Sequence, residues 1–277
     1  MKAFSLKALA LVAFMTTSGC AISQNNTDLP IKKEEITSFS SVVEDVNQLN
    51  AKYGSSNVLI VVDIDNTLLT SSVDLGGDVW YQWQRGALEI KPTEAQKVSC
   101  LFEDSIGLLY ELTPMYLTEK SVPSMIEKWQ ANDNTLIALT SRAPKYRAAT
   151  ERELARNGIN LESASLSPIG EDKALYRETL KRELSYMKGV MMTSGMNKGE
   201  MIDYILQKTG RSFDAIVFVD DSEKNIVNVY DQFKDRNQID TNIYHYVNIE
   251  HQRQEAFGSV LTQAQADKMA KEWTDLN

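Results

Sequence analysis

Residues 58–67 read VLIVVDIDNT, and the rest of the chain is best interpreted outward from them. Five consecutive apolar residues, three of them valine, are followed at once by Asp63 and, two positions later, by Asp65. A short unbroken run of this kind is typical of a strand that is buried on both faces, as in a parallel sheet. The sequence therefore predicts a central strand with two carboxylates at its carboxyl end.

Further apolar runs recur along the chain, and amphipathic helical patterns separate them. The later runs are 136–139, 190–192, 215–219 and 243–247, and the helical patterns are 122–131, 145–157, 198–208, 223–233 and 264–273. Alternating buried strands and helices predict an α/β fold with a central, mainly parallel sheet flanked by helices. Apolar residues spaced three and four apart predict one more helix, over 31–53, ahead of the first strand.

Two segments are too long to be simple crossovers. Residues 71–117 contain the aromatic group Trp80, Tyr81 and Trp83 and an apolar helical pattern, and residues 159–188 are rich in charge. One or both are expected to form a mostly helical cap. The aromatic group is interpreted as packing between cap and core, with a lining role at the substrate entrance as the alternative. Cys100 lies in the apolar pattern and is expected to be a small buried core residue.

The first 20 residues have the three parts of a secretory signal. Lys2 and Lys7 precede an apolar run over 8–15, and small polar residues lead to Cys20. The run is too short to span a bilayer. The segment resembles a bacterial lipobox, which implies a lipid anchor at Cys20 and an exported, membrane-anchored lipoprotein, on the outer membrane facing the periplasm. Cleavage after Ala21, giving a soluble periplasmic protein, is the alternative.

The composition narrows the class of protein. The chain has 277 residues, of which 43% are hydrophobic and 24% charged, which is typical of a globular protein and excludes a disordered chain or a multi-span membrane protein. Because the signal carries two lysines and no acid, its removal would shift the net charge from −9 to −11. An acidic body argues against nucleic acid as the main partner. The expected organisation is a signal at 1–20, a tether and helix at 21–54, and a catalytic domain at 55–277.

Polar residues follow the predicted strands, at the edge where ligands bind in open α/β sheets. These residues are Asp63 and Asp65, then Thr140, Ser141 and Arg142, then Asp220 and Asp221, while Lys198 opens a helix. One carboxylate can accept a phosphoryl group, and a second, two residues on, can move a proton. Carboxylates from two strand ends can hold Mg²⁺, and Thr140 with Lys198 can bind phosphoryl oxygens.

In order and type, these motifs resemble the haloacid dehalogenase superfamily, specifically its aspartate-dependent phosphatases and an exported bacterial subgroup. The matching segments are 63–67, 136–140, 198 and 217–221, and the resemblance covers roughly 58–247. It implies a Rossmann-like sheet with a cap and a set of roles for individual residues. Asp63 would be the nucleophile and a Mg²⁺ ligand, Asp65 the general acid/base with its carbonyl on the metal, Thr67 a brace for the turn, Thr140, Ser141 and Lys198 the phosphoryl-binding residues, and Asp220 and Asp221 further metal ligands.

The predicted function is a Mg²⁺-dependent phosphatase that hydrolyses a small phosphorylated substrate through an aspartyl-phosphate, outside the cytoplasm. The alternatives are a non-catalytic surface lipoprotein of the same fold that binds a partner, and a phosphotransferase. Lys173 and Lys188 compete with Lys198 for the phosphate-binding role. Arg142 either reaches the site or caps the helix that follows. His245 and His251 lie outside the motifs and are expected to have surface or structural roles.

Overall fold

The computed structural model describes residues 29, 31–171 and 173–276. The expected signal segment and Cys20 lie outside the described residues. Within them, eight strands form one sheet in the order β1-β10-β9-β2-β5-β8-β7-β6, and β3 pairs with β4 in a separate ribbon. The strands are β1 Lys32–Ile36, β2 Val58–Val62, β3 Leu69–Ser71, β4 Met115–Leu117, β5 Thr135–Thr140, β6 Tyr176–Thr179, β7 Glu183–Met187, β8 Val190–Met192, β9 Ala215–Asp220 and β10 Asp240–Tyr246.

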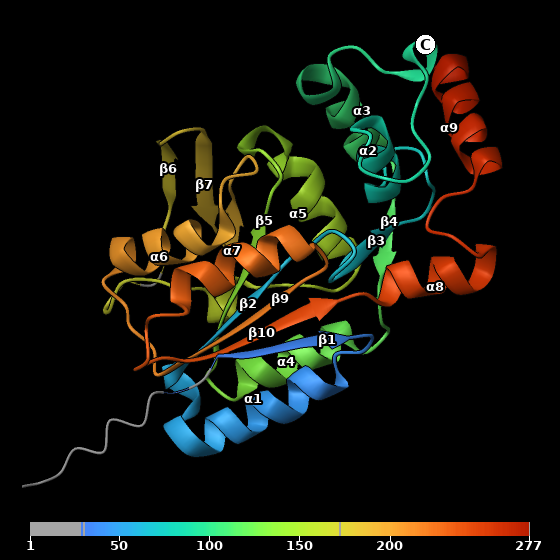
Figure 1. The fold of residues 1–277 in the computed structure, drawn as a ribbon. Helices are drawn as coiled ribbons and strands as arrows, with labels where there is room; N and C mark the ends of the chain where they lie inside the picture. Colours follow the sequence, from blue (N-terminus) through green and yellow to red (C-terminus); the bar gives the residue numbers. More distant parts are fainter. Residues whose placement is uncertain (1–28, 30, 172, 277) are drawn as a thin grey trace, which may run out of the picture.

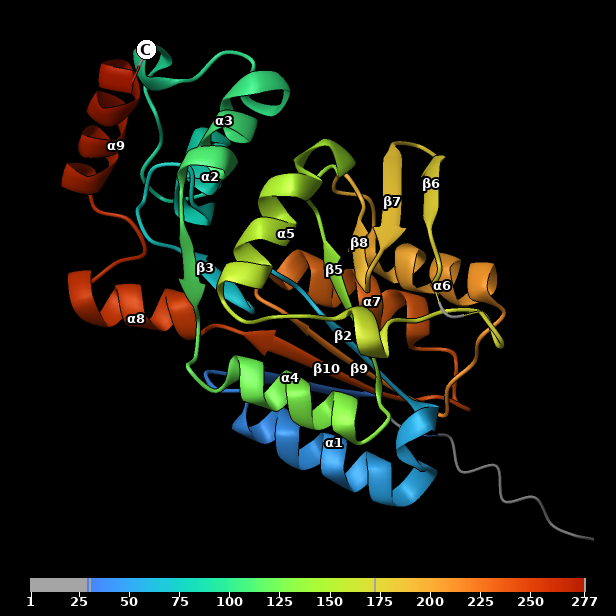
Figure 2. The same ribbon diagram turned by 180° about the vertical axis from the view of Figure 1, so that it is seen from behind.

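Helices cover both faces of this sheet. One face carries α6 and α7, and the other carries α1, α4 and α5 (Figures 1 and 2). The helices are α1 Ser40–Tyr53, α2 Asp78–Gln84, α3 Ile106–Leu112, α4 Val122–Ala131, α5 Arg147–Arg156, α6 Lys198–Thr209, α7 Glu223–Phe233, α8 Asn248–Phe257 and α9 Gln263–Leu276. Single turns lie at Ser55–Asn57, Glu94–Gln96, Pro144–Tyr146 and Glu162–Ala164, with a π turn at Leu101–Ser105.

The strand directions confirm the predicted fold class. Every pair from β1 through β8 in the sheet order is parallel, and only the β8–β7 and β7–β6 pairs are antiparallel. All five residues of β2 are buried, as the unbroken apolar run predicts. The protein is thus an α/β fold with a central, mainly parallel sheet flanked by helices.

The strand order indicates where in the sheet a ligand-binding site is expected. From β2 the chain moves outward to β5 and β8, then returns to the other side of β2 and forms β9 and β10. The order reverses between β2 and β9, and crevices at such a reversal are where open α/β sheets bind ligands. The carboxyl ends of β9, β2 and β5, which carry Asp220, Asp63 and Thr140, are therefore neighbours.

Three helices form a cap apart from the sheet. α2 and α3 come from the first insertion, and α9, from the end of the chain, packs against them in a cluster with Trp80, Trp83 and Met269 (Figure 1). Trp80 and Trp83 are fully buried, so these two rings do pack the cap. Tyr81, between them in sequence, instead lines the cleft described below.

Several sequence-based expectations were wrong in detail. The helix expected over 31–53 begins only at Ser40, because residues 32–36 pair with β10 as the edge strand β1. The second insertion is not helical: it contains the β6–β7 hairpin, which extends the sheet. Cys100 is exposed rather than buried, at a left-handed residue (φ 56°) where the helical pattern breaks. The division into tether and catalytic domain stays a prediction.

Candidate functional site

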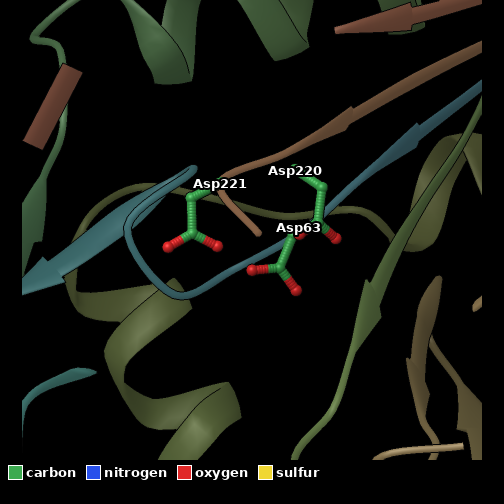
Figure 3. Close-up of side chains that lie close together, drawn as sticks. All are labelled: Asp63, Asp220 and Asp221. Atoms are coloured by element: carbon green, nitrogen blue, oxygen red, sulfur yellow. The ribbon is translucent and has the colours of Figure 1, made fainter. Parts of the chain in front are cut away.

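Three carboxylates converge where β2 and β9 end. Val62 pairs with Val219, and the backbone N–H of Asp63 continues the ladder by donating to the Val219 carbonyl at 2.9 Å. This register sets Asp63 beside Asp220 and Asp221. One carboxylate oxygen from each of the three lies within 4.8 Å of the others, and the three side chains lie close together (Figure 3). Three oxygen ligands this close together fit a hard divalent cation.

Lys198 reaches the same cluster from the first turn of α6. Its side chain is fully buried, its ammonium forms an ion pair with Asp63, and it lies 2.6 Å from the Asp220 carboxylate. Gly199 allows α6 to pack closely against α7, because a Cβ at residue 199 would lie 2.4 Å from the Asn228 carbonyl on α7. The two other lysines considered for the phosphate-binding role lie elsewhere. Lys173 pairs with Glu162 and Lys188 pairs with Glu151, and both lysine side chains are exposed.

The carboxylates of the cluster carry more negative charge than the Lys198 ammonium can balance. Burial raises the pKa of Asp63 to about 8, with the charges of Asp220 and Asp65 adding to it and that of Lys198 opposing it. Burial also raises the pKa of Asp221 well above its ordinary value. One ammonium cannot balance three buried carboxylates, so a bound cation would lower the cost of ionising them.

Asp65 is held by Arg142, which reaches the site rather than capping the next helix. Arg142 is 5% exposed and donates to both Asp65 oxygens, from Nε at 2.9 Å and Nη2 at 2.6 Å. Its third nitrogen donates to the Thr150 hydroxyl at 3.1 Å. A bidentate pair of this kind fixes both side chains in one geometry. Asp65 is thereby positioned by β5 and α5 as well as by its own loop.

The two motif residues at the end of β5 differ in exposure. Thr140 is buried, and its hydroxyl accepts the backbone N–H of Arg142 at 3.1 Å. Ser141 is exposed and lines the cleft beside it. Thr67 is also buried, yet its hydroxyl has no hydrogen-bond partner among the described residues. The turn is braced instead through the Thr67 carbonyl, which accepts from the Thr118 hydroxyl at 2.5 Å.

The sequence did not reveal the contribution of the cap. Asn66 adopts a left-handed conformation (φ 52°), and its amide donates to Asp78, the first residue of α2, at 3.2 Å. Burial, and then the charge of Asp65, raises the pKa of Asp78 to about 6. The only local feature of the sequence that pointed to this contact was the pair of glycines 76 and 77 before Asp78. An acid of the cap thus sits against the loop that carries Asp63 and Asp65.

His245 also joins the site, although it belongs to no motif. Its Nε2 donates to the carbonyl of Asp221 at 2.9 Å, because His245 on β10 pairs with Asp220 on β9. The place of His245 beside the acids follows from the strand order alone.

Asp63, Asp65 and Asp221 lie at the floor of a cleft of about 610 Å³ between sheet and cap, whereas Asp220 and Lys198 are fully buried outside its lining. Motif residues in its lining are Asp63, Asp65, Thr140, Ser141, Arg142 and Asp221. The cap contributes Asp78 and several aromatic side chains. A cleft of this volume accommodates a small organic molecule.

Comparison with known proteins gives distant relatives. The chain is 22% identical over 200 residues to a Chlamydia pneumoniae protein named "Putative outer membrane protein", covering 71% of this chain and 70% of that one. A Chlamydia trachomatis protein of the same name is 20% identical over 186 residues, 67% of each chain. In the described part of this chain, no helix is long and apolar enough to cross a membrane. Residues 35–277 match the family described as "Protein of unknown function (DUF2608)", and the chain belongs to that family.

Proposed function

We propose that this protein is a Mg²⁺-dependent phosphomonoesterase of the haloacid dehalogenase type, which works through an aspartyl-phosphate on Asp63. The observation that carries the proposal is the meeting of Asp63, Asp220 and Asp221, with the buried Lys198 paired to the first two, beside a cleft that Asp63 and Asp221 line. Three carboxylates and an ammonium suit a phosphate dianion only if a cation is also bound, because the acids alone would repel it.

The residues fit Mg²⁺ on the chemistry of the donor set. Asp63, Asp220 and Asp221 supply hard oxygen ligands, and the raised pKa of Asp63 and Asp221 reflects buried negative charge that a cation would balance. Bound there, Mg²⁺ would neutralise charge on the phosphoryl group and on its attacking carboxylate. The Asp220 carboxylate is held in place for this role. One of its oxygens lies against Lys198, and the other accepts from the Ser222 N–H and the Asn225 amide, each at 2.9 Å.

The reaction needs two displacements at phosphorus. The Asp63 carboxylate attacks, the ester P–O bond breaks, and protonated Asp65 gives its proton to the leaving oxygen. Water then attacks the aspartyl-phosphate, Asp65 takes a proton from that water, and phosphate leaves with Asp63 restored. Each Asp65 oxygen accepts one hydrogen bond from Arg142, so the proton would occupy the second lone pair of one of these oxygens. Lys198 and Thr140 would hold the transferred oxygens.

Phosphate release from a generic phosphate monoester tests the proposal. The chain from residue 21 onward is expected to release phosphate with Mg²⁺ and to stop when EDTA removes the metal. Asp220→Asn, which takes away one metal ligand, should lower the rate at limiting Mg²⁺ more than at saturating Mg²⁺. Metal-independent release, or none from a broad set of monoesters while Mg²⁺ binds, would refute the assignment.

Metal binding is expected to depend on pH because the ligands must lose protons. With the Asp63 pKa raised to about 8, Mg²⁺ affinity should rise from pH 6 to pH 8, by up to about tenfold per pH unit for each proton released. The raised pKa of Asp63 also predicts that the metal-free protein loses stability as pH rises from about 4 to 8. In this window Asp63 is ionised in the unfolded chain but protonated in the folded chain, so a rise in pH favours the unfolded chain. Mg²⁺ should therefore stabilise the folded protein most at the upper end of that window.

Calorimetric Mg²⁺ titrations at pH 6, 7 and 8, in two buffers with different protonation enthalpies, measure both affinity and protons released. Asp221→Asn should reduce both quantities. An exposed acid away from the cluster serves as control, and Asp231→Asn should change neither. Affinity that is independent of pH, with no proton release, would contradict this account of the cluster.

We also propose that the protein acts outside the cytoplasm, anchored through lipidated Cys20. The signal-like segment supports this location, as do the relatives that carry the name "Putative outer membrane protein".

A further inference from the structure

Four aromatic side chains form a connected wall along the cleft, here called the aromatic wall: Tyr81, Phe102, Tyr110 and Tyr146. The Tyr81 and Phe102 rings meet edge to face with centroids 5.9 Å apart, and Tyr110 and Tyr146 do so at 5.2 Å. The Tyr146 hydroxyl donates to the Phe102 carbonyl at 2.6 Å and joins the two pairs. Three of the four belong to the cap.

Phe102 stands out within the wall because the residue is 55% exposed although its carbonyl accepts two hydrogen bonds. Its carbonyl accepts from the Lys145 ammonium at 2.8 Å as well as from Tyr146. It lies in the π turn, a distortion that recurs at functional sites. A ring held at a cleft in this way gains by covering its apolar surface with another ring.

One end of the aromatic wall lies next to Arg142, which holds Asp65. The Arg142 guanidinium, which holds Asp65, stacks on Tyr110 with its carbon 4.0 Å from the ring centroid. Gly107 lets Tyr146 close up behind, since a Cβ there would lie 2.9 Å from the Tyr146 ring. Whatever is bonded to the leaving oxygen near Asp65 therefore meets the aromatic wall within its first few atoms.

The cleft also carries the charge that such a substrate needs. Arg85, Arg182 and Lys224 line it together with the wall. Arg85 is placed by Tyr81, whose hydroxyl accepts from its Nη1 at 2.8 Å. These cations favour the approach of a phosphate dianion toward the acidic floor.

We infer that the preferred substrates are phosphate monoesters in which an aromatic ring is bonded directly to the ester oxygen, as in aryl phosphates and O-phosphotyrosine. This inference rests on the proposed phosphatase activity. In the reaction the bond between phosphorus and the aryl oxygen breaks, the aryl oxygen takes the proton, and the products are a phenol and phosphate. In a nucleoside 5′-monophosphate the ring is several bonds from the ester oxygen and would miss the near end of the wall.

Binding of non-hydrolysable phosphonates tests ring recognition apart from catalysis. In calorimetry with saturating Mg²⁺, phenylphosphonate should bind about five- to tenfold more tightly than cyclohexylphosphonate, which matches its bulk without an aromatic face. Tyr110→Leu, which takes away the ring nearest to Asp65, should remove most of this preference, and Phe102→Ala should remove part of it. Phe257→Ala should retain it, since Phe257 is 52% exposed and lies outside the cleft lining. Equal affinity for the two phosphonates, an unaffected Phe102→Ala, or tighter binding of adenosine 5′-monophosphate would overturn the inference.

Hydrolysis assays separate this inference from the proposed function and identify the source of the ester. O-phosphotyrosine should exceed O-phosphoserine in kcat/KM, and Phe102→Ala should raise KM for the former alone. A peptide containing phosphotyrosine, compared with the free amino acid, tells a protein-borne ester from a small one, and activity on either supports the ring chemistry. If alkyl esters are cleaved while the two phosphonates bind equally, only the inference fails. If phenylphosphonate binds preferentially and no ester is hydrolysed, the proposed function fails instead.

Discussion

Asp63→Asn is expected to lower Mg²⁺-dependent phosphate release by roughly 10⁴-fold or more, because an amide cannot act as the nucleophile that forms the acyl phosphate. The fold should survive the change. Asparagine has nearly the same shape as aspartate, and Lys198 keeps its contact with Asp220 at 2.6 Å. The measurement is single-turnover and steady-state phosphate release, together with thermal unfolding of the same preparations.

The matched control is Asp231→Asn on α7, where the carboxylate is 56% exposed and pairs with Lys234 on the surface. It should leave both rate and stability near those of the parent protein. A second control is labelling: acid-stable retention of phosphate on the protein during turnover should be seen with the parent and lost with Asp63→Asn. If Asp63→Asn turns over at the parental rate with Mg²⁺, another group is the nucleophile and the proposed function is wrong.

Lys198→Met is expected to have the largest effect on stability, a loss of about 3–5 kcal/mol in the free energy of unfolding without metal. Methionine fills the space of the lysine stem but leaves Asp63 and Asp220 buried without their countercharge. The loss should be greatest at alkaline pH, because burial raises the pKa of Asp63 to about 8 and this carboxyl can stay protonated at lower pH. Mg²⁺ should restore part of the stability by supplying positive charge, while phosphate release stays low because the phosphoryl oxygens lose a ligand.

Denaturant unfolding at pH 5, 7 and 9, with and without Mg²⁺, measures these effects. Lys208→Met, on the same helix but with its exposed side chain in a surface pair with Glu178, should cost no more than about 1 kcal/mol. Should Lys198→Met be as stable as the parent at pH 9 without metal, Lys198 is not the countercharge of the cluster.

The motif residues at the strand ends could be predicted because the signal for them is local. A buried parallel strand must be a short apolar run, so Asp63, Thr140 and Asp220 could each be placed at the end of one. Parallel strands end at a common edge, so these residues were expected to gather there. Lys198 was harder, since only its position at the start of a helix distinguished it from Lys173 and Lys188. Its deep burial depends on the packing of α6 against α7, which Gly199 allows.

Other features depend on partners that are distant in sequence. Residues 32–36 form an edge strand because β10, some 200 residues later, offers a free edge, and the same pattern alone favours a helix. The charged second insertion becomes a hairpin because β7 completes the edge left by β8. The pairing of Arg142 with Asp65 and the place of Asp78 against Asn66 likewise depend on where β5 and the cap come to lie.

Local periodicity and the identity of the residues after each apolar run were thus enough to indicate the α/β fold, the order of its main strands and helices, and the acids of the floor. They could not indicate the cap formed by α9 with α2, the exposed Phe102, or the wall that continues from Arg142 through Tyr110. These arise from packing between segments far apart in the chain, where each contact has its energy only once the others are made. Short motifs therefore indicate the acidic cluster, whereas long-range packing of the cap determines the aromatic wall of the cleft above it.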